Sequence, residues 1–199
     1  MRPAATSIQR AFNFAGSVTA ERRVGTTRLV FFADLQDEEV ARRAHRGIGA
    51  IVDRGVINAL WELPEDLEIP RESLPEWVLK RLGGFVAVEI SEVVRRRVRP
   101  PLAIRGAAAT GRNLSRLLDA LGPLSSVCAT AAVVTGTEPR PDEAALLNAR
   151  LFGVAVGVVS DDNIHVLGHA ETFQPDIGPY QWHLAELVYA EIAETSVKQ

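Results

Sequence analysis

The sequence predicts an α/β fold, built as a single domain over residues 1–199 with a central mixed β-sheet, strand-helix-strand crossovers and a C-terminal helix. Two observations predict this class. A segment made of a strand, a short helix, a glycine and a two-strand hairpin occurs twice, in residues 27–63 and 126–170, which indicates an internal duplication. In both copies the run after the glycine is apolar on both faces, as in strands that helices cover on either side. A chain of 199 residues, 47% of them hydrophobic, is long enough to bury one substantial core.

The amino-terminal part predicts a hairpin, a helix and a second hairpin. Residues 12–19 contain the aromatic and β-branched side chains typical of a strand, and a turn separates them from a second predicted strand, residues 28–33. A helix over residues 37–46 has acidic residues in its first turn and basic residues in its last, which complements the helix dipole, and Gly47 ends it. The first copy is completed by two short predicted strands, residues 48–52 and 56–61.

The segment between the copies predicts two further helices. A capping box at residues 73–76 starts the first of them. Residues 85–98 fit a helix or a strand equally well. The second helix, residues 111–121, directs its leucines inward and leaves Arg112 and Arg116 on a neighbouring face, one turn apart.

The second copy repeats the order of the first. A strand over residues 127–134 leads to a helix over residues 141–150, and Gly153 ends that helix. Two strands follow, residues 154–159 and 164–167. The copy therefore predicts a crossover between parallel strands with an added hairpin.

The C-terminal segment predicts a long outer helix from Pro179 to about Ser196. Four apolar residues recur there at spacings of three and four, so we expect their face to be buried: Trp182, Ala185, Tyr189 and Ile192. Glu186 and Glu194 are expected to point outward.

Charge is distributed unevenly along the chain. Residues 93–118 contain seven arginines and no acid, whereas residues 142–199 contain nine acids against Arg150 and Lys198. This pattern fits an anionic partner for the basic segment, or the pairing of the two segments across the fold.

Several classes of site are not expected. The sequence contains no phosphate-binding loop, dinucleotide-binding glycine pattern, nucleophile elbow or zinc-protease helix motif. Cys128 is the single cysteine and lies in an apolar run, so we expect it to be buried. His165, His169 and Glu171 lie too far apart on an extended strand to hold one metal. The apolar runs are too short to cross a membrane and no signal peptide is evident, which predicts a cytoplasmic protein without a membrane partner.

The amino-terminal hairpin, strand and helix resemble the core of the restriction-endonuclease-like nucleases. That family holds catalytic magnesium with an acid on one strand and an acid-x-lysine pair on the next. In residues 30–36, Val-Phe-Phe-Ala-Asp-Leu-Gln, the resemblance places Asp34 at the second acid and Gln36 at the lysine, and Glu21 at the end of the preceding strand supplies the first acid. Residues 131–159 resemble the segment that follows this core. The alternative interpretation of Asp34 is a helix cap.

Three functional hypotheses follow. The first is a nuclease-like, catalytically degenerate protein that binds nucleic acid, or a partner that processes nucleic acid, through a group of arginines: Arg95, Arg96, Arg99, Arg112 and Arg116. The second is an active nuclease that uses Glu21, Asp34 and Gln36, the one case in which a cofactor, Mg²⁺, is expected. The third is a non-enzymatic, homo-oligomeric interaction protein, such as a homodimer, in which the basic middle of one subunit meets the acidic end of another.

Overall fold

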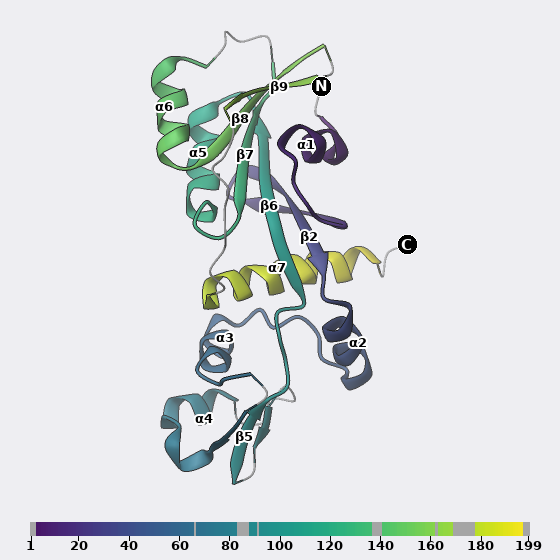
Figure 1. Cartoon of the computed structure of the whole chain (residues 1–199), viewed down its shortest axis with the longest axis vertical. Helices are drawn as coiled ribbons and strands as arrows, with labels where there is room; N and C mark the ends of the chain where they lie inside the picture. The colour runs from purple at the N-terminus through teal and green to yellow at the C-terminus, as the bar shows by residue number, and fades with distance from the viewer. Residues whose placement is uncertain are drawn as a thin grey trace. The chain divides into compact units, whose positions relative to one another are not determined.

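Helices and strands are interspersed along the chain (Figure 1), and the predicted α/β class is confirmed. The computed structural model describes residues 3–65, 67–82, 88–90, 92–136, 141–161, 163–168 and 178–196, of which residues 88–90, 195 and 196 by their backbone alone. Among these residues, no helix is long and apolar enough to cross a membrane.

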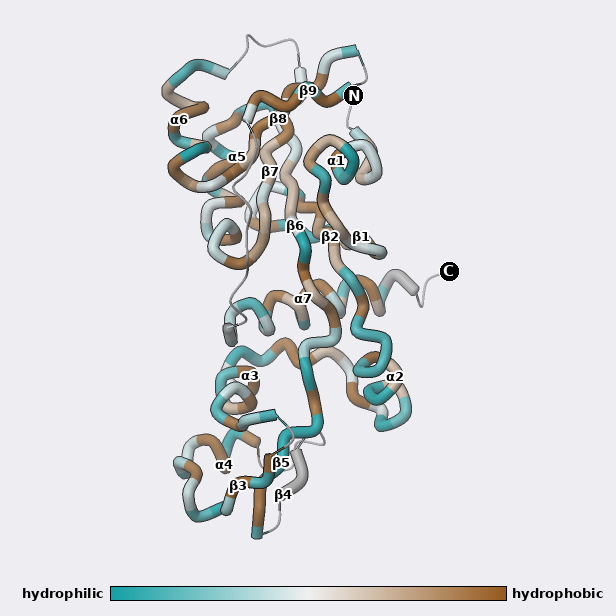
Figure 2. The backbone as a smooth tube through the Cα atoms, viewed as in Figure 1, coloured by the Kyte–Doolittle hydropathy of each residue, from teal (hydrophilic) through white to brown (hydrophobic). Residues whose placement is uncertain are grey.

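A six-stranded mixed sheet has the strand order β1-β2-β6-β7-β8-β9. Its middle strands β6, β7 and β8 are parallel, whereas β1 with β2 and β8 with β9 form antiparallel hairpins at the two sides. Figure 2 shows predominantly hydrophobic colouring along β7 and β8, as expected for strands that are buried on both faces. The bounds are β1 (Val18–Val24), β2 (Thr27–Leu35), β6 (Leu102–Gly111), β7 (Ala129–Val134), β8 (Val154–Ser160) and β9 (Asn163–Gly168).

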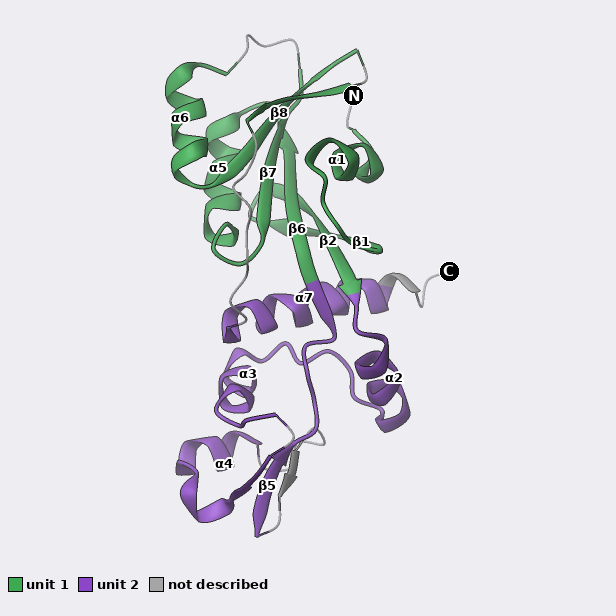
Figure 3. Ribbon diagram, viewed as in Figure 1, with its two compact units in different colours: residues 1–34, 104–176 green, residues 35–103, 177–199 purple. Residues whose placement is uncertain are grey.

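The chain divides into two compact units (Figure 3). Unit 1 consists of Met1–Asp34 and Ile104–Asp176, and unit 2 of Leu35–Ala103 and Ile177–Gln199. The division does not test whether either unit folds alone, so the single domain over residues 1–199 stays a prediction.

Helices cover both faces of the sheet in unit 1. α5 (Leu114–Leu121), followed by the 3-10 turn η2 (Gly122–Leu124), and α6 (Glu143–Leu151) connect the parallel strands on one face, and α1 (Ala5–Phe12) lies on the other (Figure 1). Gly153 adopts φ +65° after α6, so the strand, helix, glycine and hairpin predicted for the second copy are all present. The core under α1 joins residues of four strands to the amino-terminal segment: Ile8, Phe14, Val30, Phe32, Ala108, Ala131, Val133 and Ala155.

The strand predicted over residues 12–19 is wrong for residues 12–17. Residues up to Phe12 belong to α1, and β1 starts only at Val18. Asn13 ends the helix in the left-handed conformation, with φ 53°. Phe14 is buried all the same, because its ring packs on Phe32 with 5.2 Å between ring centroids. The aromatic residues therefore indicate burial here and not a strand.

Unit 2 combines helices with a small antiparallel sheet of order β3-β5-β4. Its helices are α2 (Asp37–Arg46), α3 (Arg54–Trp61), α4 (Glu76–Leu82) and α7 (Pro179–Ser196), with a 3-10 turn η1 (Arg71–Ser73). The strands are β3 (Glu68–Pro70), β4 (Val88–Ile90) and β5 (Val93–Arg96), so the described part of the ambiguous segment 85–98 contains strands. Its core includes Ile51, Ile57, Leu60, Val78, Leu82, Val94 and Trp182.

The prediction that residues 27–63 repeat the structure of residues 126–170 is wrong for the residues after Gly47. Residues 48–52 form no strand, and residues 56–61, the second predicted strand, lie in helix α3. Asp53 causes this outcome, because its Oδ1 accepts the N–H groups of Gly55 at 2.7 Å and Val56 at 3.0 Å and so caps the helix. The two copies therefore share a strand, a helix and a glycine, and then differ.

Candidate functional site

Of the three residues that the resemblance assigns to catalysis, Glu21 is not brought close to Asp34. Glu21 on β1 lies opposite Val30 of β2 and forms an ion pair with Arg28. Asp34 is four residues beyond Val30, roughly 13 Å along an extended strand. Gln36 belongs to unit 2, where its backbone N–H donates to the Pro101 carbonyl oxygen at 2.9 Å. Across the described parts of the chain, no group of three or more His, Cys, Asp or Glu side chains is arranged to hold a metal ion.

Asp34 makes two structural contacts within unit 1. Its Oδ1 accepts the backbone N–H of Ser17 at 2.9 Å, and its Oδ2 accepts the Nε–H of Arg105 at 2.8 Å. The hydrogen bond from Arg105 lowers the pKa of Asp34 below its ordinary value. Asp34 does not cap α2, because Gln36 occupies the N-cap position and no side chain caps that helix. The helix-cap interpretation is therefore wrong, and Asp34 joins β2 to β6 instead.

Three of the five arginines assigned to nucleic-acid binding are in unit 2 and contact carboxylates. Arg95 Nη1 is 3.6 Å from Glu68 Oε1, in agreement with the register that pairs these residues across β3 and β5. Arg96 and Arg99 both form ion pairs with Glu65. Arg96 is 8% exposed, and its guanidinium lies 5.1 Å from the centre of the Trp182 ring. These contacts stabilise unit 2 and reduce the charge that its surface offers to an anion.

The other two, Arg112 and Arg116, flank the amino end of α5 in unit 1. Gly111 ends β6, Arg112 follows, and Asn113 caps the helix by accepting the Arg116 N–H at Oδ1, at 3.0 Å. Both arginines are exposed, and neither guanidinium forms an ion pair or hydrogen bond with another residue of the described ranges. Because Arg116 is in the first turn, its side chain extends back towards the helix start.

The loop after β7 lies beside Arg112. The Thr135 N–H donates to the Gly111 carbonyl oxygen at 2.8 Å. Gly136, at φ +124°, is so placed that a Cβ atom there would be 3.6 Å from Arg112 Cγ. We call Arg112, Asn113, Arg116, Thr135 and Gly136 the carboxyl edge, since they follow the carboxyl ends of β6 and β7. This is the side of an open α/β sheet on which ligands usually bind, and a helix amino end there favours anions.

A buried ion network in unit 2 is the main feature that the sequence did not predict. Arg43 and Glu186 are both fully buried, and they form a two-pronged contact of 2.8 and 2.7 Å. Glu39 accepts the Arg43 Nε–H at 2.8 Å, and Glu186 also accepts the Trp182 Nε1–H at 2.9 Å. The prediction that Glu186 points outward is therefore wrong. The sequence did contain a signal, because Glu186 shares the helical spacing of the apolar residues Trp182, Ala185 and Tyr189.

This network stabilises the structure. Burial by itself would lower the pKa of Arg43, but the hydrogen bonds and charges of Glu186 and Glu39 raise it above the ordinary value. The Ile51 N–H also donates to Glu186 Oε2, at 2.8 Å. The charged groups of the network are thus hydrogen-bonded to other protein groups. These contacts fix α7 against α2 and against the segment that follows α2.

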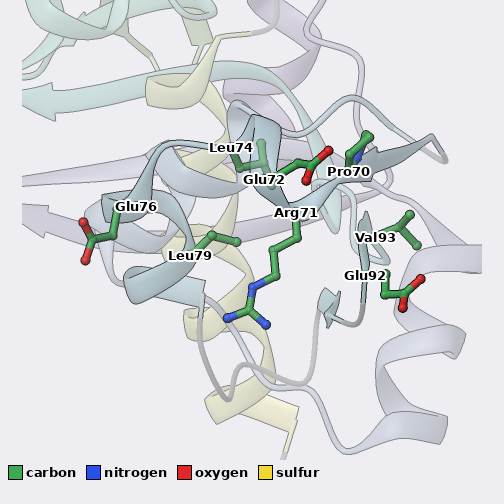
Figure 4. A pocket seen from close by; sticks show the side chains of 8 residues that line it. All are labelled: Pro70, Arg71, Glu72, Leu74, Glu76, Leu79, Glu92 and Val93. Carbon is green, nitrogen blue, oxygen red and sulfur yellow. The ribbon is translucent and has the colours of Figure 1, made fainter.

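Unit 2 also contains an open groove of about 740 Å³ (Figure 4). Its lining has three carboxylates, one guanidinium and four apolar or proline side chains: Pro70, Arg71, Glu72, Leu74, Glu76, Leu79, Glu92 and Val93. In Figure 4 the Glu76 carboxylate points away from the Arg71 side chain. An excess of carboxylates makes this groove a poor site for phosphate groups.

Cys128 is not a candidate nucleophile. Cys128 is buried, as predicted, and burial raises the pKa of its thiol to about 12, so the reactive thiolate is disfavoured at neutral pH. His165 is exposed on β9. His169 and Glu171 lie outside the described residues.

No protein-family model, curated protein or solved structure matches this chain. The resemblance to the restriction-endonuclease-like nucleases therefore stays a prediction.

Proposed function

We propose that this protein binds the phosphate backbone of nucleic acid, and that Arg112 and Arg116 at the carboxyl edge make the principal contacts. The observation that carries the proposal is the position of two exposed guanidinium groups at the amino end of α5, without a carboxylate partner among the described residues. The site is smaller than the group of five predicted arginines, because Arg95, Arg96 and Arg99 form ion pairs with Glu65 and Glu68.

The chemistry of the carboxyl edge suits phosphate. A guanidinium presents several N–H donors in one plane, which matches the oxygen atoms of a phosphate group. The first amide groups of a helix add partial positive charge at the same place. The edge contains no aromatic residue, so base stacking does not contribute there. The resulting binding is salt-sensitive and indifferent to base sequence, with a Kd on the order of 10⁻⁴ to 10⁻⁶ M at physiological salt.

Fluorescence anisotropy with a labelled DNA duplex at low salt tests this function. The double variant Arg112→Ala with Arg116→Ala is expected to weaken binding at least about tenfold, since two charge-assisted contacts are lost. The matched control is Arg10→Ala with Arg23→Ala, which removes the same charge from two exposed positions of unit 1 outside the carboxyl edge. We expect this control to bind nearly as the native protein does. Equal weakening by both double variants, or no binding by the native protein, would contradict the proposal.

A further inference from the structure

The outer face of α6 exposes apolar side chains. Leu147 is 56% exposed, Leu151 75% and Phe152 52%, whereas Ala149 on the opposite face is 1% exposed. Hydrophobic and hydrophilic colours alternate along α6 in Figure 2. Exposed Ala144 lies at the same helical spacing as the two leucines, so Ala144, Leu147 and Leu151 form a continuous α6 stripe. Contiguous exposed apolar surface of this kind is typical of an interaction site.

The charges beside the α6 stripe identify the partner that fits it. Glu143 and Arg150 are seven residues apart, close to two turns, and therefore lie on the same flank of the stripe. When two identical helices pair antiparallel about a two-fold axis, each flank faces the same flank of the other helix. An axis that passes near Leu147 places Glu143 opposite the partner's Arg150, and the reciprocal pair forms by symmetry. A parallel two-fold pair would instead place this flank opposite the partner's other flank, so that Glu143 and Arg150 would not face each other.

We propose that the α6 stripe binds the α6 stripe of a second copy of this chain in an antiparallel, two-fold symmetric pair. Leu147 then packs on the partner's Leu147 at the axis, and Leu151 lies towards the amino end of the partner's helix. Both leucines are removed from water. The two ion pairs between Glu143 and the partner's Arg150, one at each end of the contact, fix the antiparallel direction of the helices. A nine-residue helix is only about 13.5 Å long. The contact is therefore smaller than a standard interface, and the dimer forms at high protein concentration.

Sedimentation equilibrium over about 1 to 1,000 µM protein measures this association. The native chain is expected to shift from monomer to dimer, and Leu147→Glu to stay monomeric throughout the range. Leu67→Glu is the matched control, because Leu67 is 61% exposed but lies in unit 2. Circular dichroism confirms that each variant is folded. A native protein that stays monomeric, or a Leu147→Glu variant that dimerises as the native protein does, would overturn the proposal.

Two single charge reversals test the direction of the pair. In a dimer of Glu143→Arg, two arginines face each other at each end of the contact. In a dimer of Arg150→Glu, two glutamates face each other at each end. Each variant alone is therefore expected to dimerise at least about tenfold more weakly than the native protein. When the two variants are mixed, positions 143 and 150 of one chain are both basic and those of the other chain are both acidic. Opposite charges then meet at both ends of the antiparallel pair, and the mixture is expected to recover native association as a heterodimer. A mixture that associates no better than its components would rule out the antiparallel pair.

Discussion

All five N–H groups of the Arg43 guanidinium have acceptors, although the side chain is fully buried. Two donate to Glu186, one to Glu39, and two to the carbonyl oxygens of Gly49 and Arg99. A buried charge is tolerated when it is paired and hydrogen-bonded in this way, and removal of one partner leaves the other charge uncompensated. The Arg43–Glu186 pair therefore makes the stability of unit 2 depend on a contact between residues 143 positions apart.

Replacement of Glu186 by glutamine is expected to lower the free energy of unfolding by about 3 to 5 kcal/mol, because the buried Arg43 keeps its charge and loses the carboxylate that accepts two of its hydrogen bonds, with Glu39 as its remaining ionic partner. Urea unfolding followed by circular dichroism measures the change. Glu194→Gln on the same helix is the control, since Glu194 is exposed, and a change within about 0.5 kcal/mol is expected there. Equal stability of the two variants would show that the buried pair contributes nothing.

The contribution of Asp34 to the free energy of unfolding is expected to depend on pH. The hydrogen bond from Arg105 lowers the pKa of Asp34 in the folded protein, against a smaller opposing effect of burial, and the Ser17 N–H lowers it further. The unfolded chain has the ordinary value of about 3.9. The stabilisation is therefore complete above this value and is lost as the pH falls through the lower folded-state pKa. The carboxylate is partly exposed, so the effect is on the order of 0.5 kcal/mol.

The measurement is the difference in unfolding free energy between native protein and Asp34→Asn from pH 7 to pH 2. We expect it to be constant above about pH 5 and to shrink below about pH 4. In an Arg105→Gln background most of this dependence should disappear, because the main cause of the lowered pKa is absent. A difference that does not vary with pH would refute this role of Asp34.

Individual elements could be predicted where local chemistry is strong and unambiguous. Helix α2 occurs at the predicted residues because acidic residues at its start, basic residues at its end and Gly47 all favour the same bounds. The apolar residues Val56, Ile57, Leu60 and Trp61 fit the periods of both a strand and a helix, and the capping contact of Asp53 decides for helix α3. The hairpin of β8 and β9 was recognised from its apolar runs and intervening turn.

The amino-terminal segment packs so closely on the sheet that one glycine of β6 is expected not to tolerate a larger side chain. A Cβ atom at Gly106 in β6 would lie 2.7 Å from Cδ1 of the Phe14 ring. Gly106→Ala is therefore expected to lower the free energy of unfolding by about 1 to 3 kcal/mol, measured by chemical denaturation. Gly168→Ala in β9 is the control, because nothing lies within 4 Å of its added Cβ. If both substitutions had the same small effect, the close approach of Phe14 to β6 would be refuted.

At the scale of the whole molecule, the order of the elements hides how the chain is divided. Residues 35–103 are inserted between most of β2 and most of β6, and they form unit 2 together with the C-terminal segment that contains α7. Local patterns carry no mark of such an insertion, because they indicate whether a segment is a helix or a strand and not the unit in which it packs. The same limit applies to the candidate site. The sequence showed a run of arginines, but only the fold distinguishes Arg95, Arg96 and Arg99, which have carboxylate partners, from Arg112 and Arg116.

The most direct test of phosphate binding at the carboxyl edge is a map of backbone amide chemical shifts, recorded on ¹⁵N-labelled protein during titration with a short DNA duplex at low salt. We predict that the largest changes occur at residues 112–116 and 135–136, and that they decrease as salt is added. Changes confined to residues 65–99, or no changes at saturating DNA, would contradict the proposal.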